Sequence, residues 1–149
     1  MGEWDFNEWA ESYDEDIMVE DWIHKDYWKV LWLVAKKVDG TVVDVGCGTG
    51  NILKFLNCER YMGIEPSSGM RKVFRKKWGF EPLNGHFLNL PLPNETADTV
   101  ITTYAFHHVP DEDKELAIGE MFRILKLGGR IIIADVMFES NKEKQRIGY

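Results

Sequence analysis

The spacing of hydrophobic residues changes along the chain near residue 40. Within residues 18–38, apolar side chains recur every three or four positions, which predicts an amphipathic helix that ends at Asp39 and Gly40. Residues 41–45 are then mostly β-branched, as in a buried strand. We therefore expect a helix that is followed closely by a strand.

The rest of the chain alternates in the same way. We expect further strands at residues 61–65, 82–85, 97–102 and 130–136. We expect helices at residues 51–57 and 67–78, and a third that begins at Pro110 and is stopped by Gly128–Gly129. Continuous apolar strands between amphipathic helices are typical of a parallel sheet that is covered by helices on both faces. The pattern therefore predicts the α/β class.

Composition narrows the class of protein. The chain has 149 residues, of which 44% are hydrophobic and 29% charged, enough for one domain with its own core. Its longest apolar run is about six residues, whereas a membrane-spanning helix needs ~20. The amino terminus is acidic, unlike a secretory signal, and the two cysteines, Cys47 and Cys58, cannot form a disulfide framework. We therefore expect a reduced, cytoplasmic protein with no membrane association.

The charge distribution bears on the partners. The net charge is −7, and the first 21 residues contain nine acidic residues and no lysine or arginine, which disfavours anionic substrates. One basic cluster lies within residues 71–77, on the predicted helix 67–78, which also has an apolar side. We interpret it as a solvated helix face rather than an RNA contact, because nucleic-acid-binding proteins usually carry a strongly basic surface. The sequence does not favour nucleic acid as a partner.

The stretch VVDVGCGTG, residues 42–50, carries the main functional signal. A glycine-rich turn between a strand and a helix lets the backbone approach a ligand, because no Cβ intervenes. Its spacing is G-x-G-x-G, not the G-x-G-x-x-G of dinucleotide-binding turns. Asp44, two residues before the first glycine, would repel a pyrophosphate but would suit an ammonium group. S-adenosylmethionine (SAM) carries an ammonium group and no phosphate. Glu65 ends the next strand, 19 residues after Gly46, where an acid commonly accepts hydrogen bonds from ribose hydroxyls.

Four segments resemble successive motifs of the class I SAM-dependent methyltransferases: VVDVGCGTGNI, GIEPSSGM, TYAFHHVPDEDK and EMFRILKLGGRIIIADVMF. The segment EWAESYDE is similar to the W-A-x-x-Y-D segment of small bacterial members, many of which are assigned as methyltransferases only from their family membership. The resemblance implies a Rossmann-like sheet in one SAM-binding methyltransferase domain, residues 1–149. Residues 1–38 would form a helical cap and residues 39–149 the core.

The resemblance also implies a set of cofactor-binding residues. Asp44, Gly46, Gly48 and Gly50 would shape the methionine half of the site, with Glu65 on the ribose. Pro66 and Met70 would lie beside the adenine, and Tyr13 would reach the cofactor from the amino-terminal segment. The remaining members of the expected set are Cys47, Asn51, His86, Phe87 and Thr103. Packing explains the small Cys47 side chain better than nucleophilic catalysis does.

The chain departs from the family pattern at two places. Where the family often has an acid after the third strand, this chain has His86, followed by Phe87, whose rings can contact adenine. Family members also usually continue with two further strands, and this chain ends at Tyr149, so the sheet would lack them. Residues Ile131–Val136 would then form a sheet edge. Either a second copy or another partner covers that edge, or the sequence is part of a longer product.

Candidate catalytic residues follow the fourth strand. Tyr104, His107 and His108 are expected at the mouth of the cleft, and a histidine there can deprotonate a hydroxyl or an amine. The alternative is that one histidine packs and the other bonds to the backbone. The histidine and cysteine spacings do not match a zinc site, so we expect no metal.

The predicted function is SAM-dependent methyl transfer by in-line displacement to a small-molecule acceptor, at oxygen, nitrogen or carbon. Alternatives are a SAM-binding protein without transferase activity, such as a regulatory or partner-dependent subunit, and an RNA methyltransferase. A nicotinamide-dependent oxidoreductase is a further alternative, which the turn spacing and Asp44 disfavour.

Overall fold

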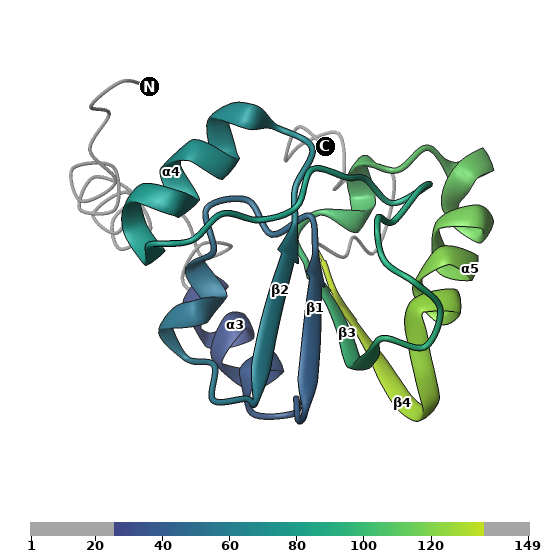
Figure 1. The fold of residues 1–149 in the computed structure, drawn as a ribbon, viewed down its shortest axis with the longest axis horizontal. Coiled ribbons are helices and arrows are strands. Elements are labelled where there is room, and N and C mark those ends of the chain that lie inside the picture. Colours follow the sequence, from purple (N-terminus) through teal and green to yellow (C-terminus); the bar gives the residue numbers. More distant parts are fainter. Residues whose placement is uncertain (1–25, 136–149) are drawn as a thin grey trace.

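The computed structural model describes residues 26–135, drawn in colour in Figure 1. The predicted contribution of Tyr13, the first part of the predicted helix 18–38, and Val136 therefore lie outside the described residues. The described helices are α3 (Tyr27–Ala35), α4 (Ser68–Trp78) and α5 (Lys114–Ile124). The strands are β1 (Thr41–Val45), β2 (Arg60–Ile64), β3 (Ala97–Thr103) and β4 (Leu125–Ala134). Three 3₁₀ turns accompany them: η1 (Asn51–Lys54), η2 (Phe106–His108) and η3 (Asp111–Asp113).

The four strands form one parallel sheet in the order β2-β1-β3-β4, which confirms the predicted α/β class. Val42 of β1 lies opposite Tyr61 on one side and Thr99 on the other, so β1 is central. The chain moves outward from β1 to β2 and then returns to the opposite side of β1 for β3. This reversal opens a crevice at the carboxyl ends of β1 and β3, the usual ligand position in such sheets.

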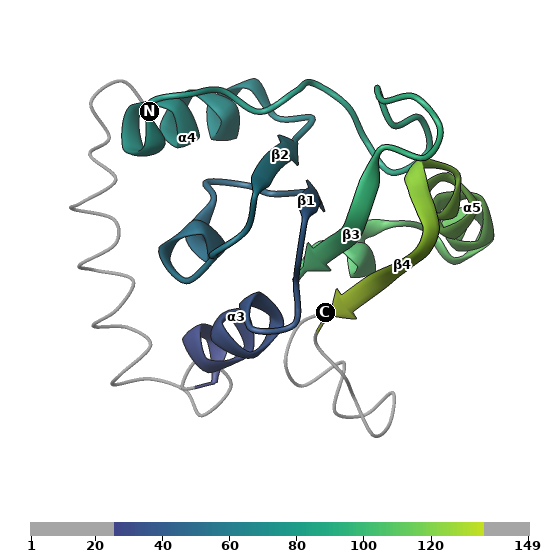
Figure 2. The same cartoon turned by 60° about the horizontal axis from the view of Figure 1, so that its bottom comes forward.

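Helices cover both faces of the sheet, as expected from its continuous apolar strands. In Figures 1 and 2, α3 and α5 lie on opposite sides of the sheet. Successive side chains of a strand point to opposite faces, so the sheet contributes residues to two hydrophobic clusters, one on each face. The cluster under α3 contains Leu31, Val34, Ala35, Val42, Ile52 and Ile101. The cluster under α5 contains Val43, Val45, Ile64, Leu90, Ala97, Val100, Met121 and Ile124.

Helix α4 is capped at both ends as its sequence predicts. The side chain of Ser67 accepts a hydrogen bond from the Met70 amide at 3.2 Å, and Gly79 ends the helix with φ +85°. Val73 and Phe74 are buried, and the Phe74 ring stacks on Tyr61 of β2 at 6.2 Å between centroids. The caps and the buried side fix α4 beside the carboxyl end of β2.

Two short elements that we predicted are smaller in the structure. The expected helix 51–57 is only the 3₁₀ turn η1, because two helical turns barely offset the cost of nucleation and its N-cap, Gly50, supplies no side-chain bond. The expected strand 82–85 is reduced to one parallel bridge between Leu83 and Ile64. Pro82, which lacks an amide hydrogen, limits a longer ladder there.

The predicted ends of two helices are also wrong. Helix α3 ends at Ala35 rather than near residue 38. Helix α5 ends at Ile124, and the pair Gly128–Gly129 lies inside β4 rather than stopping the helix. Gly128 has φ +82°, and the register of β3 with β4 shifts between Ala97 and Thr99, so the glycines form an irregularity in the strand. None of the helices in residues 26–135 has the length and apolar character that a membrane crossing requires.

Candidate functional site

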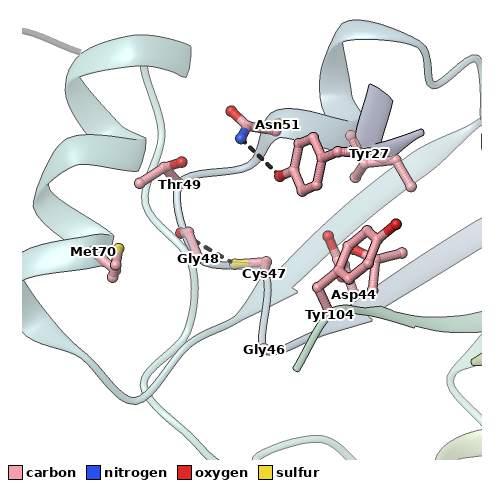
Figure 3. Close-up of a pocket in the computed structure, with 11 residues that line it drawn as sticks. Tyr27, Asp44, Gly46, Cys47, Gly48, Thr49, Asn51, Met70 and Tyr104 are labelled. Atoms are coloured by element: carbon pink, nitrogen blue, oxygen red, sulfur yellow. Dashed lines mark hydrogen bonds between the residues drawn. The ribbon is translucent and has the colours of Figure 1, made fainter. Parts of the chain in front are cut away.

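A cavity of about 370 Å³ lies at the carboxyl ends of β1 and β3. This size is within the range of small-molecule sites. In Figure 3, Met70 of α4 lies on one side of the glycine turn, and Tyr27 and Tyr104 lie on the other. The cavity is lined by Tyr27, Asp44, Gly46, Cys47, Gly48, Thr49, Asn51, Ile52, Met70, Thr103 and Tyr104.

The glycine turn presents bare backbone to this cavity. The amides of Gly46 and Cys47 donate to the carbonyl of Ile64 at 2.8 and 3.1 Å, which ties the start of the turn to β2. Gly48 follows with φ +58°, and a Cβ built on it would meet no atom within 4 Å. Because the space beside Gly48 is open and the residue lines the cavity, a ligand can lie directly against its backbone.

Asp44 lines the cavity and is a carboxylic acid with a strongly raised pKa. Its side chain is 1% exposed, and its Oδ2 accepts a hydrogen bond from the Tyr61 hydroxyl at 2.8 Å. Its Oδ1 is buried without a hydrogen-bond partner among residues 26–135. Burial raises the pKa of Asp44 from 3.8 to about 7, the Tyr61 bond opposes this shift, and the charge of Glu65 adds to it. A buried carboxylate oxygen that lacks a donor suits a ligand that brings a cationic donor.

Glu65 lies behind the turn rather than on the cavity lining. Its Oε1 accepts from the Gly48 amide at 2.8 Å and its Oε2 from the Ser67 amide at 2.9 Å. Its carbonyl accepts from the Arg71 guanidinium at 2.9 Å. The carboxylate therefore fixes the glycine turn against the start of α4, and each of its oxygens retains a second lone pair.

The sequence of the core matches a known family. A family model described as a methyltransferase domain matches residues 43–133, from β1 into β4. The chain belongs to the class I SAM-dependent methyltransferase family. The parallel sheet and the glycine turn agree with this membership.

Relatives and solved structures support the same family. An uncharacterized methyltransferase of Geobacillus sp. (strain WCH70) is 41% identical, with 95% of this chain and 70% of that protein covered. A SAM-dependent methyltransferase of Thermotoga maritima, named as a possible histamine N-methyltransferase, has a TM-score of 0.69 at 30% identity, with 95% of this chain and 65% of that chain covered. A chain from a solved complex that contains the Haloferax volcanii Trm112 methyltransferase activator has a TM-score of 0.70 at 26% identity, with 95% and 64% covered. The chain thus spans about two thirds of the length of these proteins.

A polar network at the cavity includes a residue that sequence reasoning missed. Nδ2 of Asn51 donates to the Tyr27 hydroxyl at 2.9 Å (Figure 3). Lys77 donates to Oδ1 of Asn51 at 2.9 Å. Tyr27 also stacks on Tyr104, with 5.1 Å between ring centroids. The helical spacing led us to predict Tyr27 as a core residue. Its hydroxyl group, on an otherwise apolar helix face, was the feature that could have indicated a position at the cavity. The expected cofactor residue Asn51 is thus at the cavity, with its amide bonded to two side chains.

The end of β3 brings two expected residues to the cavity. Thr103 and Tyr104 both line it. Tyr104 has φ +57°, a strained conformation for a residue with a side chain, and its amide donates to the Ala134 carbonyl at 2.8 Å. Strain of this kind is often found where a side chain must point into a site.

Several other expected site residues do not line this cavity. Pro66 and His86 are exposed, and Nδ1 of His86 accepts from the Leu88 amide at 3.2 Å. Phe87 packs edge-on against Phe106 at 5.7 Å between centroids. Cys47 lines the cavity, but burial raises the pKa of its thiol, and its sulfur packs close to Gly63. Such a thiol is a poor nucleophile.

The two candidate catalytic histidines lie in η2, just past the cavity lining. His107 is held by Asp135, which follows β4, through both its backbone amide and its ring. The His108 ring lies 4.1 Å from that of His107 between centroids. The structure therefore brings His107 to an acid that sequence reasoning had not connected with it. Residues 26–135 contain no cluster of three or more histidine, cysteine and acidic side chains that could hold a metal ion.

The raised pKa of Asp44 predicts how stability depends on pH. Between pH 4 and pH 7 the folded protein keeps a proton on Asp44 that the unfolded chain releases, so the unfolding free energy should fall as pH rises through this window. The contribution of Asp44 to this fall should be up to ~4 kcal/mol. Chemical denaturation without ligand at pH 4, 5, 6, 7 and 8 measures it. The difference between wild type and Asp44→Asn isolates the Asp44 contribution, and parallel pH curves for the two proteins would contradict it.

Proposed function

We propose that the protein transfers the methyl group of SAM to a small molecule, at an oxygen, nitrogen or carbon atom. The observation that carries the proposal is the buried, unpartnered Oδ1 of Asp44 beside the open backbone of Gly48. Asp44 would accept a hydrogen bond from the ammonium group of SAM. A pyrophosphate, by contrast, would be repelled by the ionised form of Asp44.

The other expected residues complete the proposed cofactor site. Glu65, already positioned on the Gly48 amide, would use its remaining lone pairs for the ribose hydroxyls. Met70, which lines the cavity from α4, would lie beside the adenine together with Pro66, His86 and Phe87. Bound SAM supplies a methyl group on a positively charged sulfur, and the protein's task is to align the acceptor with it. Tyr13 and the division into a cap, residues 1–38, and a core, residues 39–149, remain part of this proposal.

The acceptor would lie on the β3 side of the cavity, next to Thr103 and Tyr104. The Thermotoga maritima relative is named as a possible histamine N-methyltransferase, which supports a small amine as one acceptor class. The free state of both Cys47 and Cys58 is compatible with the cytoplasmic location that we propose.

The second candidate is a SAM-binding subunit without transferase activity of its own. Within residues 26–135, β4 has a neighbouring strand only on its β3 side, and a structural relative was solved in a complex with an activator. A second copy or another partner covering Ile131–Val136 would fit both observations. Binding of SAM without product formation by the isolated chain would favour this candidate.

The structure weakens the case for RNA methylation through the basic helix α4. Arg71 donates to the Glu65 and Pro66 carbonyls, and Lys77 donates to Asn51, so two of the five basic residues of α4 form hydrogen bonds within the protein. Lys72 and Arg75 are exposed. We expect Lys72→Ala and Arg75→Ala to leave methyl transfer unchanged, and a loss of transfer to RNA in these variants would instead support the RNA candidate.

The proposal is tested by binding and turnover together. The full chain would be titrated with SAM and with NAD, and incubated with methyl-labelled SAM and a pool of small amines, phenols and carboxylic acids. We expect saturable SAM binding, no NAD binding, and label in a small-molecule product. Binding of NAD in preference to SAM would contradict the family-based assignment of the cofactor.

A further inference from the structure

We propose that Asp135 is a positioning residue for methyl transfer, which holds His107 as the group that takes the proton of the acceptor. The inference rests on the proposed function and adds a residue and a role that the site described above does not include. It starts from the contact between His107 in η2, which follows β3, and Asp135, which follows β4.

One carboxylate holds His107 at two points. Oδ2 of Asp135 accepts a hydrogen bond from the backbone amide of His107 at 2.6 Å. Oδ1 of the same carboxylate contacts Nδ1 of the His107 ring at 2.5 Å. The two side chains are 13% and 25% exposed, respectively, so the pair is largely shielded from water. Two bonds to one rigid group fix both the main chain and the ring plane of His107.

The contact determines where the ring carries its proton. An ionised carboxylate only accepts hydrogen bonds, so Nδ1 of His107 carries the hydrogen that points at Asp135. In the neutral ring the lone pair is then on Nε2. A histidine oriented in this way by a carboxylate is the usual form of a general base.

The position of the pair matches the acceptor side of the site. Asp44, the glycine turn and Glu65 belong to β1, β2 and the segments that follow them, which leaves the β3–β4 side for the acceptor. The amide of Tyr104 donates to the carbonyl of Ala134, the residue before Asp135. This bond ties the cavity-lining Tyr104 to the strand end that carries Asp135, so the pair lies next to the cavity lining.

The proposed step is balanced in protons and electrons. As the acceptor atom bonds to the methyl carbon and sulfur keeps the electron pair of the broken bond, the acceptor's proton passes to Nε2 of His107 and then to water. The acceptor class is therefore a hydroxyl or an amine. His108 is an ionisable neighbour of the pair, with its ring 4.1 Å from that of His107 between centroids.

The tautomer of His107 provides a test that does not depend on turnover. Nitrogen-15 NMR of the full chain with bound S-adenosylhomocysteine should show His107 with its hydrogen on Nδ1. In Asp135→Asn this preference should be lost, because the amide NH₂ of asparagine cannot accept from both His107 donors. A wild-type ring that carries its hydrogen on Nε2 would overturn the proposal.

Activity tests the role of the pair in the reaction. With the pooled amines and phenols described above, His107→Gln and Asp135→Asn should each lower the turnover rate by about 100-fold, and the double variant should lose no more than either one. Glu112→Gln, which removes a charge from an exposed residue of η3, is the control and should keep wild-type turnover. All variants should bind S-adenosylhomocysteine with unchanged affinity. If the wild type is active and the His107 and Asp135 variants keep its turnover rate, the proposed role of the pair is wrong. If the wild type binds no SAM, the proposed function is wrong instead.

Discussion

Asp44→Asn should weaken the binding of S-adenosylhomocysteine by about 100-fold or more at pH 8, because the cofactor's ammonium group then meets a neutral amide in a buried site. Loss of one partner from a buried ion pair typically costs ~3–5 kcal/mol, and each 1.4 kcal/mol corresponds to a factor of about ten in affinity. Asparagine keeps the shape of the side chain and an oxygen that can accept from Tyr61. Isothermal titration calorimetry of the full chain measures the change.

Glu59→Gln is the matched control for this experiment. It removes the same charge from an exposed residue between η1 and β2, away from the cavity lining. We expect its affinity for S-adenosylhomocysteine to equal that of wild type. Equal affinities for Asp44→Asn and wild type would mean that the ammonium group is bound elsewhere.

Gly48→Ala should strongly weaken cofactor binding at a small cost in stability. A Cβ at residue 48 meets no protein atom within 4 Å, so the fold can accept it, but the methyl group would occupy the space against which the ligand is expected to lie. The positive φ of +58° should cost ~1–2 kcal/mol in unfolding free energy. We expect affinity to fall by about 100-fold, measured by the same titration.

Gly79→Ala separates backbone strain from loss of the site. Gly79 has φ +85° and also has no atom within 4 Å of a built Cβ, but it ends α4 outside the cavity lining. Its stability loss should match that of Gly48→Ala, while its affinity should remain that of wild type. If both variants lose binding equally, backbone strain rather than occupation of the cavity explains the effect.

Local sequence signals were sufficient for the central strands and for the centre of the cavity. The β-branched runs predicted the central strands because a strand that is buried on both faces needs apolar residues throughout. Ser67 and Gly79 predicted the caps of α4, since their backbone and side-chain properties act within one turn. Asp44 and the glycine spacing indicated the cavity because residues that are adjacent in sequence form its floor.

Contacts between distant segments account for what the sequence did not reveal. Tyr27 joins the cavity through Asn51, 24 residues away, and Asp135 meets His107 across 28 residues. Neither pairing leaves a periodic pattern in the chain. The extended residues before Gly128–Gly129 were predicted as helix because their apolar spacing suits a helix, whereas pairing of Leu125 with Ala97 places them in β4. Strand pairing and other contacts between distant segments therefore determined the structure where local propensity did not.

The most direct test of the central claim is the number of protons released when S-adenosylhomocysteine binds. Asp44, with its pKa raised to about 7, is largely protonated at pH 6.5 without ligand and must ionise to pair with the ammonium group. Titration calorimetry in two buffers of different ionisation enthalpy should therefore show saturable binding with release of a large fraction of one proton, and Asp44→Asn should release none. Saturable binding by the wild type with the same heat in both buffers would contradict the assignment of Asp44 as the ammonium-binding group.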